Sequence, residues 1–141
     1  MKTLNELKYM FIEWFEGHPM LNTVIYSDDF DFNADRHIVY PVSNIEYVNS
    51  NINNKVMNHV FKVVLADITT PDNKEMEDNI HSDMLQIAED FYTYLQNMEG
   101  FDFNKISSIN KFVDDMGDRA CGIVFTVTIS VIRPQNRCIF P

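Results

Sequence analysis

In two long stretches of the chain, an apolar residue recurs at nearly every second position. The apolar positions of this alternation are Met57, Phe61, Val63 and Leu65, with His59 among them, and then Ile123, Phe125, Val127, Ile129 and Val131. A period of two is typical of a strand with one buried face. A strand of twelve residues spans about 40 Å, whereas most strands have about five or six residues. The sequence therefore predicts long strands that extend beyond the core of a small domain.

Three further segments predict strands. Residues 36–47 precede the turn-rich segment 49–54 and form a long hairpin with the strand at 57–66, in which Pro41 marks an edge position or a bulge. Residues 21–27 and 105–113 predict a short strand and a modest one. The turn before the last strand falls in the acidic segment 114–118, and Pro134 prevents that strand from continuing.

Two amphipathic helices are predicted. The first covers 3–16, where Thr3 and Glu6 have the spacing of a capping box. The second starts with Thr70 as N-cap and Pro71 in the first turn, and ends at Gly100. Its apolar stripe consists of Met76, Ile80, Met84, Ile87, Phe91, Leu95 and Met98. Core packing is the expected role of both stripes, with docking on a neighbour as the alternative.

The predicted fold class is α+β, with the element order α-β-β-β-α-β-β. An antiparallel sheet of long hairpins, with the long helix and the short N-terminal helix packed on one face, buries all these apolar stripes together. We expect residues 1–141 to form a single domain with a C-terminal tail at 133–141.

Charge and composition exclude several functional classes. The 141 residues include 11 Lys and Arg against 21 Asp and Glu, which gives a formal net charge of −10. A negative net charge disfavours binding to nucleic acid or to an anionic membrane surface. It does not prevent DNA from passing through a channel with an acidic lining. Two cysteines are too few for a disulfide framework. No apolar run reaches the roughly 20 residues of a membrane span, and no secretory signal is expected, so synthesis in a reducing cytoplasm is predicted.

No catalytic or cofactor-binding pattern stands out. His18, His37, His59 and His81 lie on different elements, without the short spacing of a zinc site, and His59 is expected to be a hydrogen-bonded structural residue. Cys121 is expected to be buried as a small hydrophobe.

Two acidic loops have alternative interpretations. The four aspartates of segment 28–35 form either a solvated loop or a cation site, and Asp114, Asp115 and Asp118 form either a turn or an acid–base group. We expect the solvated alternatives, and we predict neither enzyme activity nor a cofactor.

The C-terminal third resembles a known family. Segment 114–129, DDMGDRACGIVFTVTI, followed by Asn136-Arg137-Cys138, is similar to the end of small head–tail connector and tail-terminator-like proteins of tailed bacteriophages, especially the neck or tail ring proteins of crAss-like phages. The predicted element order is also similar to theirs. Pro41, within the long hairpin, departs from the pattern.

This resemblance implies a structural ring subunit of the virion neck or tail, assembled in the host cytoplasm. Six or twelve copies would form a closed ring next to portal, neck or tail proteins, with DNA passing through unbound. The implied interface residues are Asn51, Ile52 and Asn53 at the hairpin tip and Arg133, Arg137, Ile139 and Phe140 in the tail. Here the arginines would meet acidic neighbours, and Ile139 and Phe140 would fill a groove.

Two other functional classes remain. One is a cytosolic adaptor that recruits a peptide by strand addition at the exposed hairpin edge. The other is a small enzyme that uses a Cys or Asp site.

Overall fold

The computed structural model describes residues 3–26, 39–69, 73–98, 102–113 and 120–132. It contains two helices, α1 (Leu4–Glu16) and α2 (Lys74–Asn97). Thr3 Oγ1 accepts a hydrogen bond from the backbone N–H of Glu6 at 3.2 Å, which confirms the predicted start of α1.

The second helix starts later than the sequence pattern suggested. Its N-cap is Asn73, whose Oδ1 accepts the backbone N–H of Met76 at 3.0 Å. Thr70 and Pro71, the predicted start, lie outside the described residues. The described helix starts at Lys74, because an Asx side chain closer to the apolar stripe satisfies the free N–H groups of the first turn. The end of α2 at Asn97 lies close to the predicted stop.

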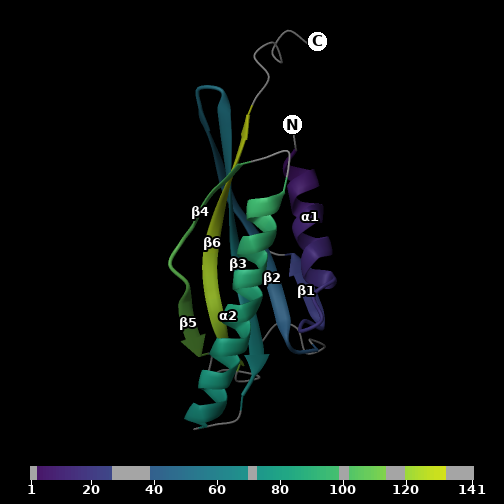
Figure 1. The fold of residues 1–141 in the computed structure, drawn as a ribbon, viewed down its shortest axis with the longest axis vertical. Coiled ribbons are helices and arrows are strands. Elements are labelled where there is room, and N and C mark those ends of the chain that lie inside the picture. Colours follow the sequence, from purple (N-terminus) through teal and green to yellow (C-terminus); the bar gives the residue numbers. More distant parts are fainter. Residues whose placement is uncertain (1–2, 27–38, 70–72, 99–101, 114–119, 133–141) are drawn as a thin grey trace.

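One six-stranded sheet lies behind the helices in Figure 1. Its strands are β1 (Thr23–Tyr26), β2 (Val42–Asn53), β3 (Val56–Ile68), β4 (Asp102–Ile106), β5 (Asn110–Val113) and β6 (Ala120–Ile132). The strand order is β1-β2-β3-β6-β4, and β5 also pairs with β6. The predicted α+β class, with helices packed on a sheet, is confirmed.

Two details of the sheet differ from the sequence-based expectation. β1 runs parallel to β2, so the sheet is mixed and not wholly antiparallel. The segment predicted as one strand at 105–113 forms two strands, β4 and β5, which both pair with β6. The chain between them turns away from the ladder at Ser107, whose backbone N–H still bonds to the Thr126 carbonyl at 2.8 Å.

The hairpin of β2 and β3 is longer than predicted. β2 continues through the asparagine-rich segment 49–53, and the turn consists of Asn54 and Lys55 alone. Asn54 has a φ of 57°, a left-handed conformation that asparagine tolerates better than most residues. Pro41 lies just before β2, where its carbonyl accepts the N–H groups of Asn22 and Thr23. It therefore does not interrupt the ladder, contrary to the predicted edge or bulge position.

β3 and β6 form the centre of the sheet, with continuous pairing from Ile68 opposite Ala120 to Val56 opposite Ile132. Their backbones approach closely at Gly122, which lies opposite Ala66. A Cβ atom at Gly122 would lie 1.9 Å from the Leu65 carbonyl oxygen and 2.8 Å from the Ala66 Cα. This position therefore requires glycine.

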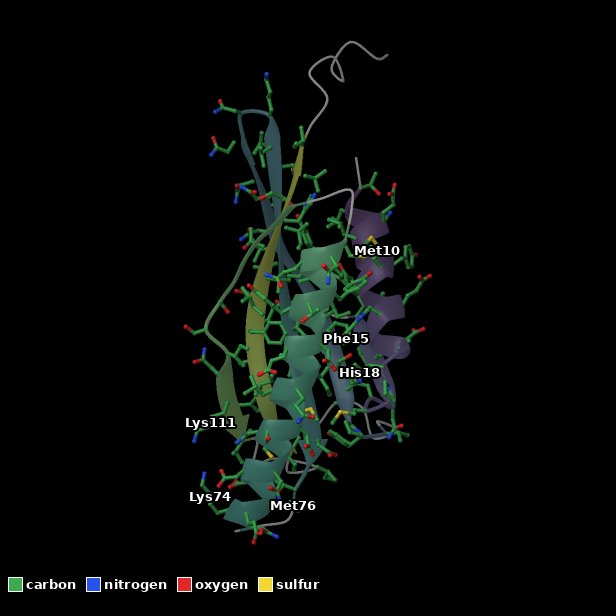
Figure 2. The ribbon with its side chains drawn as sticks, in the orientation of Figure 1. Met10, Phe15, His18, Lys74, Met76 and Lys111 are labelled. Atoms are coloured by element: carbon green, nitrogen blue, oxygen red, sulfur yellow. The ribbon has the colours of Figure 1, made fainter. Side chains whose placement is uncertain are left out.

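The main core lies between the helices and one face of the sheet. Both predicted helix stripes are buried there, including Phe11 and Phe15 of α1 and Phe91 of α2. Figure 2 shows Phe15 between the two helices, and its ring centroid lies 4.7 Å from that of Phe91. The ring of Phe11 meets those of Phe61 and Phe91 edge to face at 5.0 and 5.4 Å. Core packing of both stripes is thus confirmed.

Candidate protein interface

The sheet divides into two parts along its strands. We call residues 42–47, 61–68 and 120–127 the lower sheet, and residues 48–60 and 128–132 the upper sheet. In Figure 1 the tip of the β2–β3 hairpin and the end of β6 extend beyond the ends of both helices. The upper sheet is therefore the part of the molecule that the helices cover least.

One edge of β2 is open along most of its length. The parallel partner β1 ends with Tyr26 opposite Ile45. From Tyr47 to Asn53, β2 has β3 on one side and no strand among the described residues on the other. Unpaired N–H and C=O groups at such an edge can accept another strand.

The open edge of β2 carries a bulge and two exposed apolar side chains. The register with β3 shifts between Tyr47 and Asn49, so Val48 is the extra residue of the bulge. Val48 is 43% exposed and Ile52 is 56% exposed. A bulge reduces the ability of an edge strand to pair with unrelated strands, because the hydrogen-bond ladder is interrupted at that point.

The three predicted hairpin residues lie together on this edge. Asn51, Ile52 and Asn53 are exposed and end β2, directly before the turn, so they flank the tip rather than form it. Their place in a strand differs from the predicted loop because pairing with β3 overrides the low strand propensity of asparagine. The tail residues Arg133, Arg137, Ile139 and Phe140 lie outside the described residues. The last described residue, Ile132, lies opposite Val56, beside the turn.

A polar ladder joins three strands on the face of the upper sheet that points away from the helices. Asn58 Nδ2 donates to Asn51 Oδ1 at 3.0 Å, and Ser130 Oγ donates to Asn58 Oδ1 at 2.6 Å. These bonds connect neighbouring strands where no helix packs. They hold the extended hairpin in line with β6.

On the helix side, a second network joins β2 to β3. The hydroxyl groups of Tyr47 and Ser50 lie within hydrogen-bonding distance of each other, and Ser50 Oγ lies 2.6 Å from His59 Nδ1. His59 is almost fully buried, and this burial lowers its pKa below the usual value. The imidazole is therefore neutral near pH 7. The expectation of a hydrogen-bonded structural histidine is confirmed.

A second surface feature, missed from the sequence, is a shallow groove between the C-terminal half of α2 and the end of α1. Trp14, His18 and Tyr94 line it, and Figure 2 shows His18 between the helices. His18 Nε2 lies 3.0 Å from Asp90 Oδ2, while its Nδ1 accepts the backbone N–H of Met20 at 3.2 Å. The Nε2 contact thus joins the segment after α1 to α2, and the Nδ1 contact fixes the ring against the local backbone.

The other candidate residues that the structure describes do not come together in a metal-binding or catalytic site. No cluster of three or more His, Cys, Asp or Glu residues that could hold a metal occurs in the part of the chain that the structure describes. Cys121 is fully buried as expected, and burial raises the pKa of its thiol to about 11. Segments 28–35 and 114–118, with their aspartates, lie outside the described residues. None of the described helices is long and apolar enough to cross a membrane.

No model of a known protein family matches the chain, and a search of curated proteins finds no match either. The candidate interface therefore rests on the fold and on the contacts of the upper sheet.

Proposed function

We propose that this protein is a structural subunit of a ring in the neck or tail of a tailed bacteriophage. The ring would join head and tail around the DNA channel, as the resemblance of segment 114–129 and of Asn136-Arg137-Cys138 implies. It has no catalytic role. Neighbouring copies, and portal, neck or tail proteins, are its partners.

The observation that carries this proposal is the open edge of β2 in the upper sheet. Seven consecutive residues from Tyr47 to Asn53 have β3 on one side and no strand on the other in the part of the chain that the structure describes. Ile52 lies exposed on this segment, and the pairing of β2 with β3 continues to the turn. A subunit of a closed ring needs such a surface, because each copy binds the next through two different patches.

Charge is consistent with a DNA channel that does not bind DNA. The formal net charge of −10 repels the phosphate backbone. DNA could then pass through the ring without being held.

The adaptor function remains the second candidate, and the same open edge favours it. An extended peptide could add to β2 as an extra strand. The two proposals differ in the identity of that strand: another copy of this chain for the ring, and a foreign peptide for the adaptor.

Light scattering and negative-stain imaging over a range of concentrations test the proposal. We expect closed rings, either from the protein alone or after mixing with portal and tail proteins. Ile52→Lys should weaken assembly, because it places a charge at the open edge. Leu85→Lys is the matched control, since Leu85 is a partly exposed apolar residue on α2, away from that edge.

A chain that stays monomeric at every concentration, with and without the virion partners, would contradict the ring. Equal assembly of the Ile52→Lys and Leu85→Lys variants would remove the open edge from the interface. Deleting residues 133–141 tests the tail separately. Loss of assembly with an unchanged circular dichroism spectrum would assign those residues to the interface.

A further inference from the structure

The groove between the end of α1 and the C-terminal half of α2 is lined by one side of each helix. The lining residues of α2 are spaced three or four residues apart, which places them on the same side of the helix: Asp90, Thr93, Tyr94 and Asn97. Glu13 and Trp14 in the last turn of α1, and His18 just after it, complete the lining. The groove is therefore built from two elements that the main core holds together.

Two aromatic rings form the floor of the groove. Trp14 and Tyr94 are half-buried, and their ring centroids lie 5.5 Å apart with 27° between the ring planes. Trp14 also lies 5.2 Å from the ring of Phe91, which is fully buried. The core thus fixes the position of this floor. The faces of such rings carry partial negative charge and attract a cation within about 6 Å of the ring centroid.

Two carboxylates add negative charge to the groove. Glu13 is exposed, and the Asp90 side chain is 61% exposed. The charge of Glu13 acts on the aromatic floor, because burial and then this carboxylate raise the pKa of the Tyr94 hydroxyl above its usual value. None of the described residues that line the groove is Lys or Arg. The groove therefore has a negative potential.

His18 does not offset this charge. Its Nδ1 accepts the backbone N–H of Met20 at 3.2 Å, so this nitrogen carries no proton. The ring is then the neutral tautomer, in which Nε2–H donates to Asp90 Oδ2 at 3.0 Å. Asp90 is thus held in place by a hydrogen bond and keeps its full negative charge.

The uncharged polar side chains of the groove use hydrogen-bond donors within α2 itself. Thr93 Oγ1 donates to the Glu89 carbonyl at 3.1 Å, and Asn97 Nδ2 donates to the Thr93 carbonyl at 3.0 Å. What these two side chains can offer a ligand is mainly acceptor oxygen, at Thr93 Oγ1 and Asn97 Oδ1. The groove therefore suits a positively charged group with several donors.

An arginine guanidinium combines these properties in one flat group. It is always charged, presents five N–H donors and no acceptor, and stacks on aromatic faces. Its planar fork also bonds to carboxylates through two parallel hydrogen bonds. A lysine ammonium is a compact and strongly hydrated point charge, so it gains less from the aromatic floor.

The shape of the groove favours a side chain carried on a protein surface. Small-molecule sites are concave and bury about 70–90% of their ligand, whereas this groove is shallow. A side chain presented by a partner protein is held in place by the rest of the interface. A second copy is less suited to this role, because each copy has a formal net charge of −10 and two such copies repel each other.

From the aromatic floor, the charge and the hydrogen-bonding groups we propose that the groove between α1 and α2 binds an arginine side chain of a basic partner protein. The guanidinium lies against Trp14 and Tyr94 and bonds to the carboxylates of Asp90 and Glu13. This surface uses different elements from the open edge of β2. The inference therefore goes beyond the ring function and does not rest on it.

NMR titration of the isotope-labelled whole chain tests the proposal. Trp14 is the only tryptophan, so a single indole Nε1–H resonance reports on the groove. The probe is a Gly-Arg-Gly peptide capped at both ends, and the control peptides replace arginine by its neutral isostere citrulline or by lysine. The arginine peptide should shift this resonance with a Kd of about 1–10 mM, as expected for one side chain. Citrulline should bind at least about tenfold more weakly and lysine about threefold.

Two double variants with the same net charge locate the binding site. Glu13→Gln with Asp90→Asn removes both charges of the groove, while Asp90→Asn keeps an acceptor for His18, and it should weaken binding of the arginine peptide about fivefold. Glu16→Gln with Glu89→Gln removes two exposed carboxylates of the same helices that do not line the groove, and should change binding less than about twofold. Circular dichroism should show both variants folded.

Binding of the arginine peptide that is weakened in the groove variant and kept in the control variant supports the proposal. Absence of a shift, or equal binding of the citrulline peptide, would overturn it. Equal losses in the two double variants would mean that the overall charge of the chain attracts the peptide. A shift on raising the protein concentration without peptide would assign the groove to a second copy and contradict a basic partner protein. Light scattering measures rings separately, so either proposal can fail alone.

Discussion

The lower and upper sheets are made from the same strands but differ in what covers them. In the lower sheet, Phe61, Val63 and Leu65 of β3 are fully buried against the helices. In the upper sheet, β3 continues in the same register with β6 to Val56, and Ile129 and Val131 of β6 are still buried. Towards the tip of the hairpin, however, Met57 is only half-buried and Ile52 of β2 is mostly exposed. Strand pairing thus determines how far the sheet extends, whereas burial under the helices determines where its stability lies.

The largest expected effect is a difference in the free energy of unfolding between side-chain truncations in the two regions. Phe91→Ala removes a fully buried ring that contacts Phe11, Trp14 and Phe15, and should lower the free energy of unfolding by about 3–5 kcal/mol. Ile52→Ala should change it by less than about 0.5 kcal/mol, because its side chain is already exposed. Urea titrations measure both. Similar losses for the two variants would mean that the upper sheet has a core of its own.

The next largest loss of stability is expected at Gly122, where two strands of the lower sheet approach closely. Gly122→Ala should cost about 3 kcal/mol, because the new methyl group meets the backbone of Leu65 and Ala66 and the strands must separate. Thr128→Ala, on the same strand in the upper sheet, is the control and should have a much smaller effect. Thermal unfolding compares the two. A Gly122→Ala variant as stable as the control would show that β3 and β6 can move apart freely.

His59, next to the lower sheet, should make stability depend on pH. Burial lowers its folded-state pKa below the usual value of 6.5, so the unfolded chain binds the proton first as the pH falls. Stability is then fully present above pH 6.5 and falls as the pH drops from 6.5 toward the folded-state pKa. The slope is at most about 1.4 kcal/mol per pH unit for one proton. Unfolding of the wild type and of His59→Gln at several pH values gives this contribution by difference, and identical slopes would contradict it.

The smallest expected effect lies at the far end of the upper sheet. Asn54→Ala places a residue with a Cβ and no local hydrogen-bonding group at a φ of 57° and should cost about 1 kcal/mol. Asn54→Gly should be nearly neutral, since glycine adopts this conformation freely. Hydrogen exchange should show the Ala variant opening mainly in the upper sheet. Equal opening of the lower sheet would mean that the two regions unfold as one unit.

Most of the fold followed from periodicity, because alternation marked β3 and β6 and the helical stripes marked α1 and α2. The parallel β1–β2 pair could not be predicted, since strand direction depends on where a distant segment returns to the sheet. The extension of β2 to Asn53 was missed for a related reason. Three asparagines within 49–53 favour a turn locally, and only pairing with β3 makes them a strand.

The candidate interface was predicted in part. Asn51, Ile52 and Asn53 were singled out as the hairpin tip, and they lie exposed beside it. An exposed hairpin edge was expected for strand addition, but which residues of β2 are open could not be predicted, because that depends on where the four residues of β1 stop short of the twelve of β2.

The buried thiol of Cys121 provides a probe of rare opening events. It lies on β6 between Asp67 of β3 and Val113 of β5, and alkylation requires both its exposure and the loss of its proton. In a chain with Cys138→Ser, the rate of labelling by iodoacetamide under native conditions therefore reports how often the centre of the sheet opens. Comparing that rate between free and assembled protein would show how strongly neighbouring subunits suppress such fluctuations.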